Sequence, residues 1–274
     1  MIFFVLLFGV LYKTLNIFTN LNFYNIMNLS INFLFVAKMA PDDYVGFTFF
    51  IGCMAMMAAS VFFFFSMNSF DKKWRTSILV SGLITFIAAV HYLYMRDYWL
   101  DTFDPATGLG DSPTVFRYVD WILTVPLMCV EFYLILKPSG ATKGMLWKLI
   151  GLSTLMLVTG YFGEAGVMGL DAQLWGLVSG LAYFAIVHEI YMGNAASLAK
   201  SAGGNVESAH KMLCKFVLIG WAIYPIGYMV GTADGMWYSF MGGLSLEMDL
   251  IYNVGDAINK IGFGLVVYNL AVSK

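Results

Sequence analysis

Long apolar runs separated by short polar connections dominate the chain after about residue 40. Seven of these runs are long enough for a helix that crosses a bilayer, which needs about 20 apolar residues. We place them at about residues 43–66, 74–95, 113–136, 145–168, 172–192, 209–231 and 246–271. Because most connections are short, consecutive helices are expected to be antiparallel neighbours. The pattern predicts an all-α membrane protein built as a bundle of seven transmembrane helices.

Proline and glycine mark two irregular places in this pattern. The connection at residues 97–112 contains Pro105, Gly108 and Gly110 and is long enough to fold back as a small hairpin. Pro225 lies inside the sixth run, where it is expected to kink the helix or loosen its hydrogen-bond ladder. We expect a candidate moving element there.

The first 40 residues fit the pattern less well. Residues 2–12 are apolar, but no basic residue precedes them, so they make a poor signal peptide. We divide the chain into an N-terminal extension, residues 1–40, and a seven-helix domain, residues 41–274. The extension is either a signal-like segment that ends at a processing site near Ala40, or a misassigned start with Met39 as the true first residue.

Composition narrows the class of protein. Of the 274 residues, 60% are hydrophobic and only 12% are charged, against about 25% charged in a soluble domain. The formal net charge of −2 offers nothing to hold a nucleic acid. The three cysteines are isolated from one another, which argues against a disulfide framework and a zinc site. A membrane protein with the lipid bilayer as its main partner, without a metal and without a nucleic-acid partner, is the remaining class.

Basic residues divide unevenly between alternate connections, and this asymmetry sets the orientation. Ten lie on one side: Lys72, Lys73, Arg75, Lys137, Lys143, Lys148, Lys200, Lys211, Lys215 and Lys274. We expect this side to be cytoplasmic. The start of the first helix is then outside, and the C-terminus is in the cytoplasm.

Charged residues inside the predicted helices suggest a function, because a charge in a bilayer is expensive. Lys260 lies within the seventh run, with Asp256 four residues earlier on the same helical face, and Arg117 lies within the third run. One interpretation is a buried ion pair that joins two helices. The other is a reactive amine, because an uncharged lysine in an apolar pocket attacks an aldehyde readily.

The third run carries polar residues on one stripe. Asp120 and Thr124 are one turn apart, and Glu131 follows Asp120 by eleven residues, or about three turns. The two carboxyl groups therefore share a face at depths that differ by about 16 Å. This arrangement favours a proton relay over two unrelated structural carboxylates.

Four stretches of the chain resemble the microbial rhodopsins, and within that group the proteorhodopsins. They are residues 91–96 (HYLYMR), 111–121 (DSPTVFRYVDW), 220–225 (GWAIYP) and 252–260 (YNVGDAINK). The stretches occur in order on the predicted helices. The resemblance implies a seven-helix bundle with all-trans retinal in its core.

In that family, the lysine at the position of Lys260 carries retinal as a protonated Schiff base. Asp120 and Asp256 are then expected to supply the counterion. Trp121, Trp221 and Tyr224 are expected to line the chromophore slot, although aromatic residues at such spacings are more often plain core. The resemblance adds Met128, Pro225 and Tyr252 to the expected retinal-binding residues.

The resemblance implies a light-driven outward proton pump in the inner (plasma) membrane of a bacterium, an ion transporter and not an enzyme. Asp120 is expected to accept the Schiff-base proton and Glu131 to replace it from the cytoplasmic side. Arg117 steers charge on the outer side, Thr124 forms a hydrogen bond near the acceptor, and His91 pairs with the acceptor.

The family further implies a homo-oligomer, a ring of five or six subunits, and allows a carotenoid antenna as a partner. Two other functions stay open at this point. One is a photosensory rhodopsin that signals through a membrane partner, although sensory relatives usually lack a carboxyl group at the position of Glu131. The other is a membrane scaffold without retinal, held together by buried ion pairs.

Overall fold

Helices account for nearly all of the residues that the computed structural model describes, which are residues 39–232, 237–241 and 247–273. The segment 1–38 lies outside them, so the division of the chain at residue 40 stays a prediction. Nine α-helices occur in the described ranges. They are α3 (Tyr44–Ser66), α4 (Lys72–Thr102), α5 (Thr114–Leu136), α6 (Lys143–Glu164), α7 (Ala172–Tyr191), α8 (Asn194–Ala202), α9 (Gly204–Leu218), α10 (Ile223–Gly231) and α11 (Met248–Val272).

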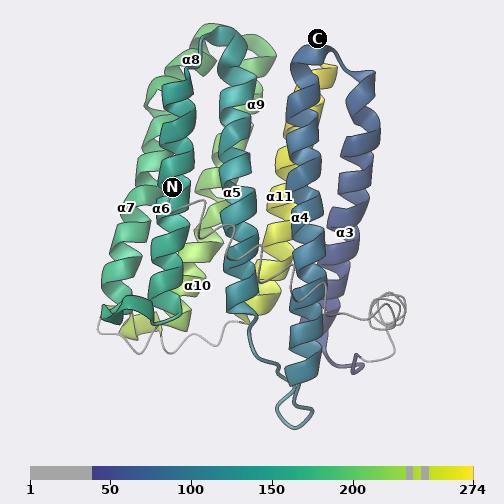
Figure 1. Cartoon of the computed structure of the whole chain (residues 1–274), viewed down its shortest axis with the longest axis vertical. Helices are drawn as coiled ribbons and strands as arrows, with labels where there is room; N and C mark the ends of the chain where they lie inside the picture. Colours follow the sequence, from purple (N-terminus) through teal and green to yellow (C-terminus); the bar gives the residue numbers. More distant parts are fainter. Residues whose placement is uncertain (1–38, 233–236, 242–246, 274) are drawn as a thin grey trace, which may run out of the picture. The chain divides into compact units, whose positions relative to one another are not determined.

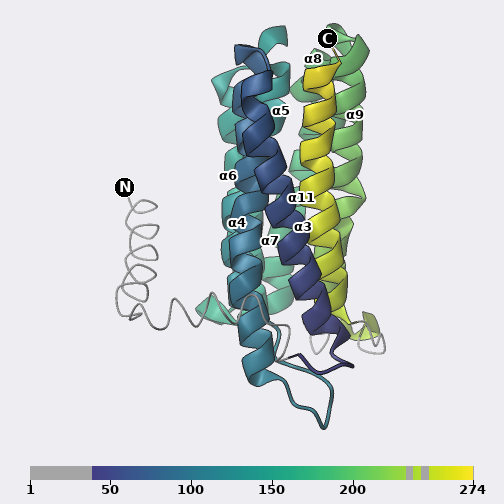
Figure 2. The ribbon, with the colours of Figure 1, turned by 90° about the vertical axis from the view of Figure 1, so that its right-hand side faces the viewer.

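These helices form one bundle with a closed circuit of neighbours (Figures 1 and 2). Each of the helices from α3 to α7 packs against the next one along the chain, and α11 packs against α3, α4 and α9. With α8 counted as an extension of α7, and α10 as the continuation of α9, the bundle has seven spanning units. The predicted seven-helix fold is confirmed.

Six of the seven units are long and apolar enough to cross a membrane by length and composition. The seventh, α11, has 25 residues but carries buried polar side chains along its inner face, including Asn253, Asp256, Asn259 and Lys260. These residues lower its mean hydropathy, although its outer face is apolar. The helix with the least typical composition for a membrane span thus contributes a row of buried polar side chains to the interior of the bundle.

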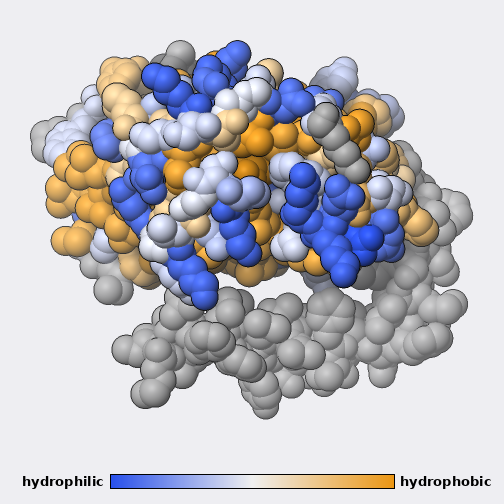
Figure 3. Space-filling view, turned by 90° about the horizontal axis from the view of Figure 1, so that it is seen from above, coloured by the Kyte–Doolittle hydropathy of each residue, from blue (hydrophilic) through white to orange (hydrophobic). Residues whose placement is uncertain are grey.

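The outside of the bundle is apolar along its length and polar at the end where the C-terminus lies. Large exposed side chains on its flanks include Phe65, Trp147 and Phe184. Figure 3 shows hydrophilic residues gathered on the end that carries α8 and the C-terminus, with hydrophobic residues at the rim. This distribution is that of a multi-pass membrane protein.

Two connections differ from their predicted boundaries. Helix α4 continues to Thr102, beyond the end of the second predicted run at about residue 95, so Arg96 lies in a helix, where it is buried. Neither Gly nor Pro occurs between residues 96 and 102, so nothing in the backbone ends the helix where the apolar run ends. The following loop does fold back, with an isolated β-bridge between Asp104 and Leu109, as predicted. Helix α8 (Asn194–Ala202) lies between the fifth and sixth predicted runs, where the sequence pattern predicts a connection and no helix.

The sixth unit is broken near Pro225, as expected. Helix α9 ends at Leu218, a 3₁₀ turn spans Gly220–Ala222, and α10 begins at Ile223. Pro225 has no backbone N–H to donate to the carbonyl of Trp221, so the regular ladder cannot pass this point. The Nδ2 group of Asn259 on α11 donates to the Gly220 carbonyl at 2.9 Å and satisfies the opened backbone.

Gly220 is required at this break because Asn259 lies against it. A Cβ atom at position 220 would collide with the Asn259 side chain. We expect Gly220→Ala to lower the free energy of unfolding by about 1–3 kcal/mol, the usual cost of overpacking, measured as a lower thermal midpoint in detergent. Gly151→Ala is the control, because a Cβ there meets nothing within 4 Å. Equal midpoints for the two variants would contradict the proposed contact.

Candidate functional site

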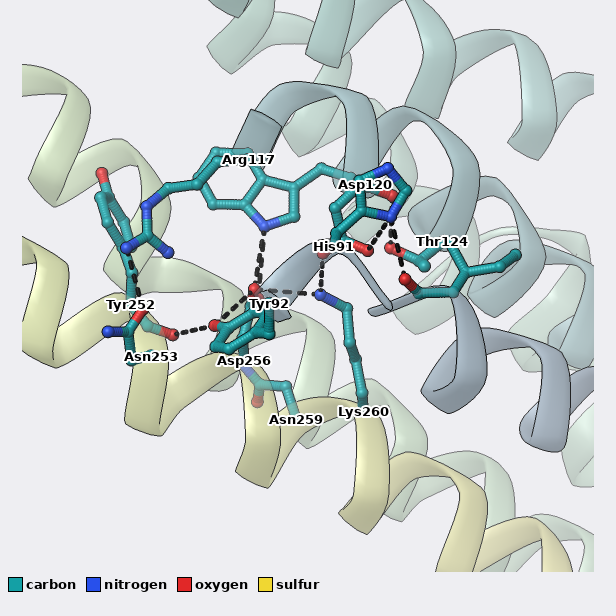
Figure 4. Close-up of polar contacts among 12 residues, drawn as sticks. His91, Tyr92, Arg117, Asp120, Thr124, Tyr252, Asn253, Asp256, Asn259 and Lys260 are labelled. Atoms are coloured by element: carbon teal, nitrogen blue, oxygen red, sulfur yellow. Dashed lines mark hydrogen bonds and ion pairs between the residues drawn. The ribbon is translucent and has the colours of Figure 1, made fainter. Parts of the chain in front are cut away.

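The centre of the bundle holds a lysine between two carboxylates (Figure 4). Lys260 Nζ lies 2.6 Å from Asp120 Oδ2 and 3.0 Å from Asp256 Oδ2. Lys260 is only 2% exposed, and both carboxylates are fully buried. Charges removed from water at this depth are tolerated only when they are paired and hydrogen-bonded. The predicted grouping of these three residues is therefore present in the structure.

The two carboxylates differ in how they are held. Asp256 accepts hydrogen bonds from the hydroxyl groups of Tyr92 and Tyr224 and from the indole N–H of Trp121. Asp120 accepts a hydrogen bond from Lys260 alone, and its Oδ1 is buried without a partner in the part of the chain that the structure describes. Asp256 is thus held by three donors besides its contact with Lys260, whereas Asp120 keeps one oxygen without a hydrogen bond among the described residues.

Thr124 and His91 flank Asp120 without a hydrogen bond to its carboxylate. The Thr124 hydroxyl donates to the backbone carbonyl of Asp120 at 2.9 Å. His91 Nδ1 lies 4.0 Å from Asp120 Oδ1 and 2.9 Å from the carbonyl of Ile87. A ring nitrogen in that position donates to the carbonyl, which leaves His91 close to Asp120 electrostatically but not bonded to it.

Glu131 occupies a separate polar pocket further along α5. It is fully buried, and its Oε1 accepts a hydrogen bond from the hydroxyl of Ser81 on α4 at 3.2 Å. Its Oε2 and the nearby Ser77 hydroxyl are buried without partners among the described residues. Among the described residues, the polar neighbours of Glu131 are the hydroxyl groups of Ser77 and Ser81, with no cation, so this buried carboxyl group is suited to hold a proton.

Arg117 lies on the other side of Lys260 and is bound by two residues that the sequence analysis did not select. Its Nη2 donates to Asp249 at 2.7 Å and to Asn253 at 2.8 Å, and its Nε donates to Asp249 at 3.2 Å. Its guanidinium carbon lies 5.1 Å and 5.2 Å from the ring centroids of Phe49 and Tyr252. The heptad-like spacing of Asp249, Asn253 and Asp256 on α11 is the signal that would have found the two partners.

An apolar cavity of about 610 Å³ adjoins the lysine site, within the range of small-molecule pockets. Four of the residues expected to bind retinal, Trp121, Trp221, Tyr224 and Pro225, line this cavity together with residues of α6 and α7. Trp121 and Tyr224 contact each other and also bind Asp256, so they form a wall shared by the cavity and the ion cluster.

Lys260, Met128 and Tyr252 are expected retinal-binding residues that do not line the cavity. Met128 is buried in the core cluster that contains Trp121, and Tyr252 packs on Trp121 from the side of Arg117. Trp121 and Tyr224, which bind the Asp256 carboxylate beside Lys260, also line the apolar cavity. The residues present therefore fit a polyene chromophore.

Comparisons with known proteins identify the family of the chain. The model of the bacteriorhodopsin-like protein family matches residues 43–274. The green-light absorbing proteorhodopsin of gamma-proteobacterium EBAC31A08 is 44% identical over 235 residues, which cover 85% of this chain and 88% of that protein. The blue-light absorbing proteorhodopsin of gamma-proteobacterium Hot 75m4 is 43% identical over the same length and coverage.

Solved structures show the same relationship. The blue light-absorbing proteorhodopsin from Med12 superposes with a TM-score of 0.64 at 38% identity, covering 84% of this chain and 98% of that chain. The rhodopsin of Exiguobacterium sibiricum gives a TM-score of 0.68 at 32% identity, covering 83% of this chain and 95% of that one. On the match of the family model and the identity to proteorhodopsins, the chain belongs to the bacteriorhodopsin-like family of microbial rhodopsins.

Proposed function

We propose that this protein is a light-driven pump that moves protons from the cytoplasm to the exterior, with retinal bound to Lys260 as a protonated Schiff base. The observation that carries the proposal is the position of the Lys260 amine. It lies against Asp120, a carboxylate with one oxygen that accepts no hydrogen bond from the described residues, while a second buried carboxyl group, Glu131, lies about three turns along the same helix.

The residues around Lys260 divide the work of balancing charge, accepting the proton and returning it. Asp256, held by three donors, stays charged and balances the cation at Lys260 Nζ. Asp120 takes up the proton from Lys260 Nζ, and Glu131 later returns one to that nitrogen from the other side. Retinal supplies the absorption of light and the change of shape on isomerisation. Trp121 and Tyr224 shape the space around it and exclude water from the ion cluster.

The membrane arrangement is part of the proposal. The positively charged connections and the C-terminus face the cytoplasm of a bacterial cell, and the start of α3 faces outside. Lys137, Lys200 and Lys211 are exposed on the end that carries the C-terminus, which supports this orientation. The homo-oligomer and the carotenoid partner stay predictions, to be tested by mass determination in detergent and by binding of carotenoid to the purified pigment.

The test is the pH of an unbuffered suspension of cells that express the chain with added retinal. Illumination is expected to acidify the medium, and a protonophore is expected to abolish the change. A coloured protein with a slow photocycle and no pH change would favour the photosensory alternative. Absence of a visible band after retinal addition would favour the scaffold without retinal.

His91 is expected to affect the protonation of Asp120, because its ring nitrogen lies 4.0 Å from the Asp120 carboxylate. Mild acidification of the pigment is expected to shift its band to the red as Asp120 becomes neutral, with loss of pumping over the same pH range. In His91→Asn the midpoint of this colour change is expected to move by about one pH unit, measured by absorption titration. His188→Asn, at an exposed position, is the control. Identical curves for wild type and His91→Asn would make His91 a structural residue.

Met128 lies two turns from Asp120 on α5 and is 1% exposed. We expect the wild-type pigment to absorb green light, and Met128→Gln to shift the band to the blue, because a polar amide changes how charge on the chromophore is stabilised. Absorption spectra of the two pigments measure the effect. Met145→Gln, at a buried position near the start of α6, is the control. An unshifted band in Met128→Gln would place Met128 in ordinary core.

A further inference from the structure

A row of polar residues on α11 connects the ion cluster with the end of the bundle opposite the C-terminus. Asp249, Asn253, Asp256 and Lys260 follow one another at spacings of four, three and four residues, so they share one helical face. The row is about 16 Å long. Asn253, Asp256 and Lys260 are at most 2% exposed, whereas the Asp249 side chain is 16% exposed. Asp249 is where this row meets solvent.

Arg117 is bound to the solvent end of the row and not to the carboxylates at Lys260. Two of its nitrogens donate to Asp249, and one of these also donates to Asn253. Among the described residues, Arg117 makes no hydrogen bond with Asp120 or Asp256. Asp249 also accepts a hydrogen bond from the hydroxyl of Ser112 at 2.9 Å, which fixes the carboxylate from the other side. The ion pair thus draws the guanidinium away from Lys260.

The position of Arg117 depends on Asp249 more than on its other contacts. The rings of Phe49 and Tyr252 lie 5.1 Å and 5.2 Å from the guanidinium carbon, but neither ring carries a charge that could hold the cation as Asp249 does. Its Nη1 is buried without a partner in the described part of the chain, so the group is not saturated where it lies. A buried cation that loses its only carboxylate partner is drawn to the nearest remaining anions.

A movement of Arg117 toward Lys260 would change the balance of charge around Asp120 and Asp256. The cluster contains two cations, Lys260 and Arg117, and three carboxylates. With Asp249 in place, one carboxylate neutralises Arg117, and Lys260 is left with Asp120 and Asp256. The titratable and charged groups around Asp120 and Asp256 are His91 and Tyr92 of α4, Arg117 of α5, Tyr224 of α10 and Lys260 of α11. Among these cations, Arg117 is the one whose distance from Asp120 depends on a further residue, Asp249.

We infer that Asp249 is a positioning residue of the pump, which holds Arg117 away from Asp120 and thereby sets the pH range in which Asp120 accepts a proton. The inference rests on the proposed function. It assigns a role to a side chain that touches neither the lysine nor the chromophore cavity.

The first test is the acid colour titration of Asp249→Asn. The amide keeps the size of the side chain and an oxygen that can accept from Arg117 and Ser112, but it removes the charge. We expect the pigment to form and the midpoint of its colour change to move to lower pH by about one unit, because Arg117 is then free to favour the charged form of Asp120. The control is Glu247→Gln, which removes the same charge from an exposed position two residues away. Its midpoint is expected to stay close to that of the wild type.

The second test asks whether Asp249 acts through Arg117. In an Arg117→Gln background, the effect of Asp249→Asn on the midpoint is expected to fall to less than half, as in a double-mutant cycle between coupled residues. Arg117→Met serves as the background if Arg117→Gln forms no pigment, because it also removes the charge that pairs with Asp249.

Equal midpoints for Asp249→Asn and Glu247→Gln would overturn the inference, and so would a full effect of Asp249→Asn in the Arg117 variants. These outcomes are distinct from failure of the proposed function. The titration needs only a coloured protein, whereas the proposed pump fails if the illuminated wild type does not acidify its medium.

Discussion

Replacement of Lys260 by alanine is expected to abolish formation of the visible pigment. Lys260 is the lysine that lies at the centre of the bundle, and the other lysines of the described segments lie at helix ends or exposed positions. The variant is prepared as apoprotein, mixed with all-trans retinal and measured by absorption. Lys215→Ala, at an exposed position on α9, is the matched control and is expected to form pigment normally.

Loss of the lysine also leaves Asp120 and Asp256 without their cation, at a cost of about 3–5 kcal/mol for a broken buried pair. Lys260→Arg separates this effect from loss of the covalent bond. Its guanidinium supplies a positive charge between the two carboxylates but does not form an imine with an aldehyde. We expect Lys260→Arg to fold more stably than Lys260→Ala and to remain colourless. A visible band in either variant would remove the central assignment.

Replacement of Glu131 by glutamine is expected to leave the colour nearly unchanged and to slow the return of the dark absorption after a flash by about 100-fold, the usual size of a lost general acid. The colour persists because Glu131 lies in its own pocket with Ser81, about three turns of α5 from Asp120. Recovery is slow in Glu131→Gln because the glutamine amide cannot supply the proton that Lys260 Nζ requires.

Flash photolysis of purified protein measures this effect. Glu207→Gln is the control, because it removes a carboxylate from an exposed ion pair with Lys211. A small permeant weak acid added to Glu131→Gln is expected to restore much of the rate, since it can deliver the proton from solution. Unchanged recovery in Glu131→Gln would make Glu131 a structural carboxyl group.

Much of this arrangement can be predicted from the sequence because it depends on distances along one helix. The apolar runs define the spanning units, since the bilayer fixes their length. The spacing of Asp256 and Lys260 places them on one face of α11, and that of Asp120 and Glu131 places them on one face of α5. Pro225 marks the break between α9 and α10 through its missing N–H.

The contacts between helices were decided only by the tertiary structure. Tyr92 and Tyr224 reach Asp256 from α4 and α10, and this difference in hydrogen bonding is the basis for the different roles that we propose for the two aspartates. The pairing of Arg117 with Asp249 joins residues 132 positions apart. Hydropathy fixes the length of a helix and which of its faces is buried. Side-chain packing across the whole bundle decides which other helix that face contacts and how the helix is rotated about its axis.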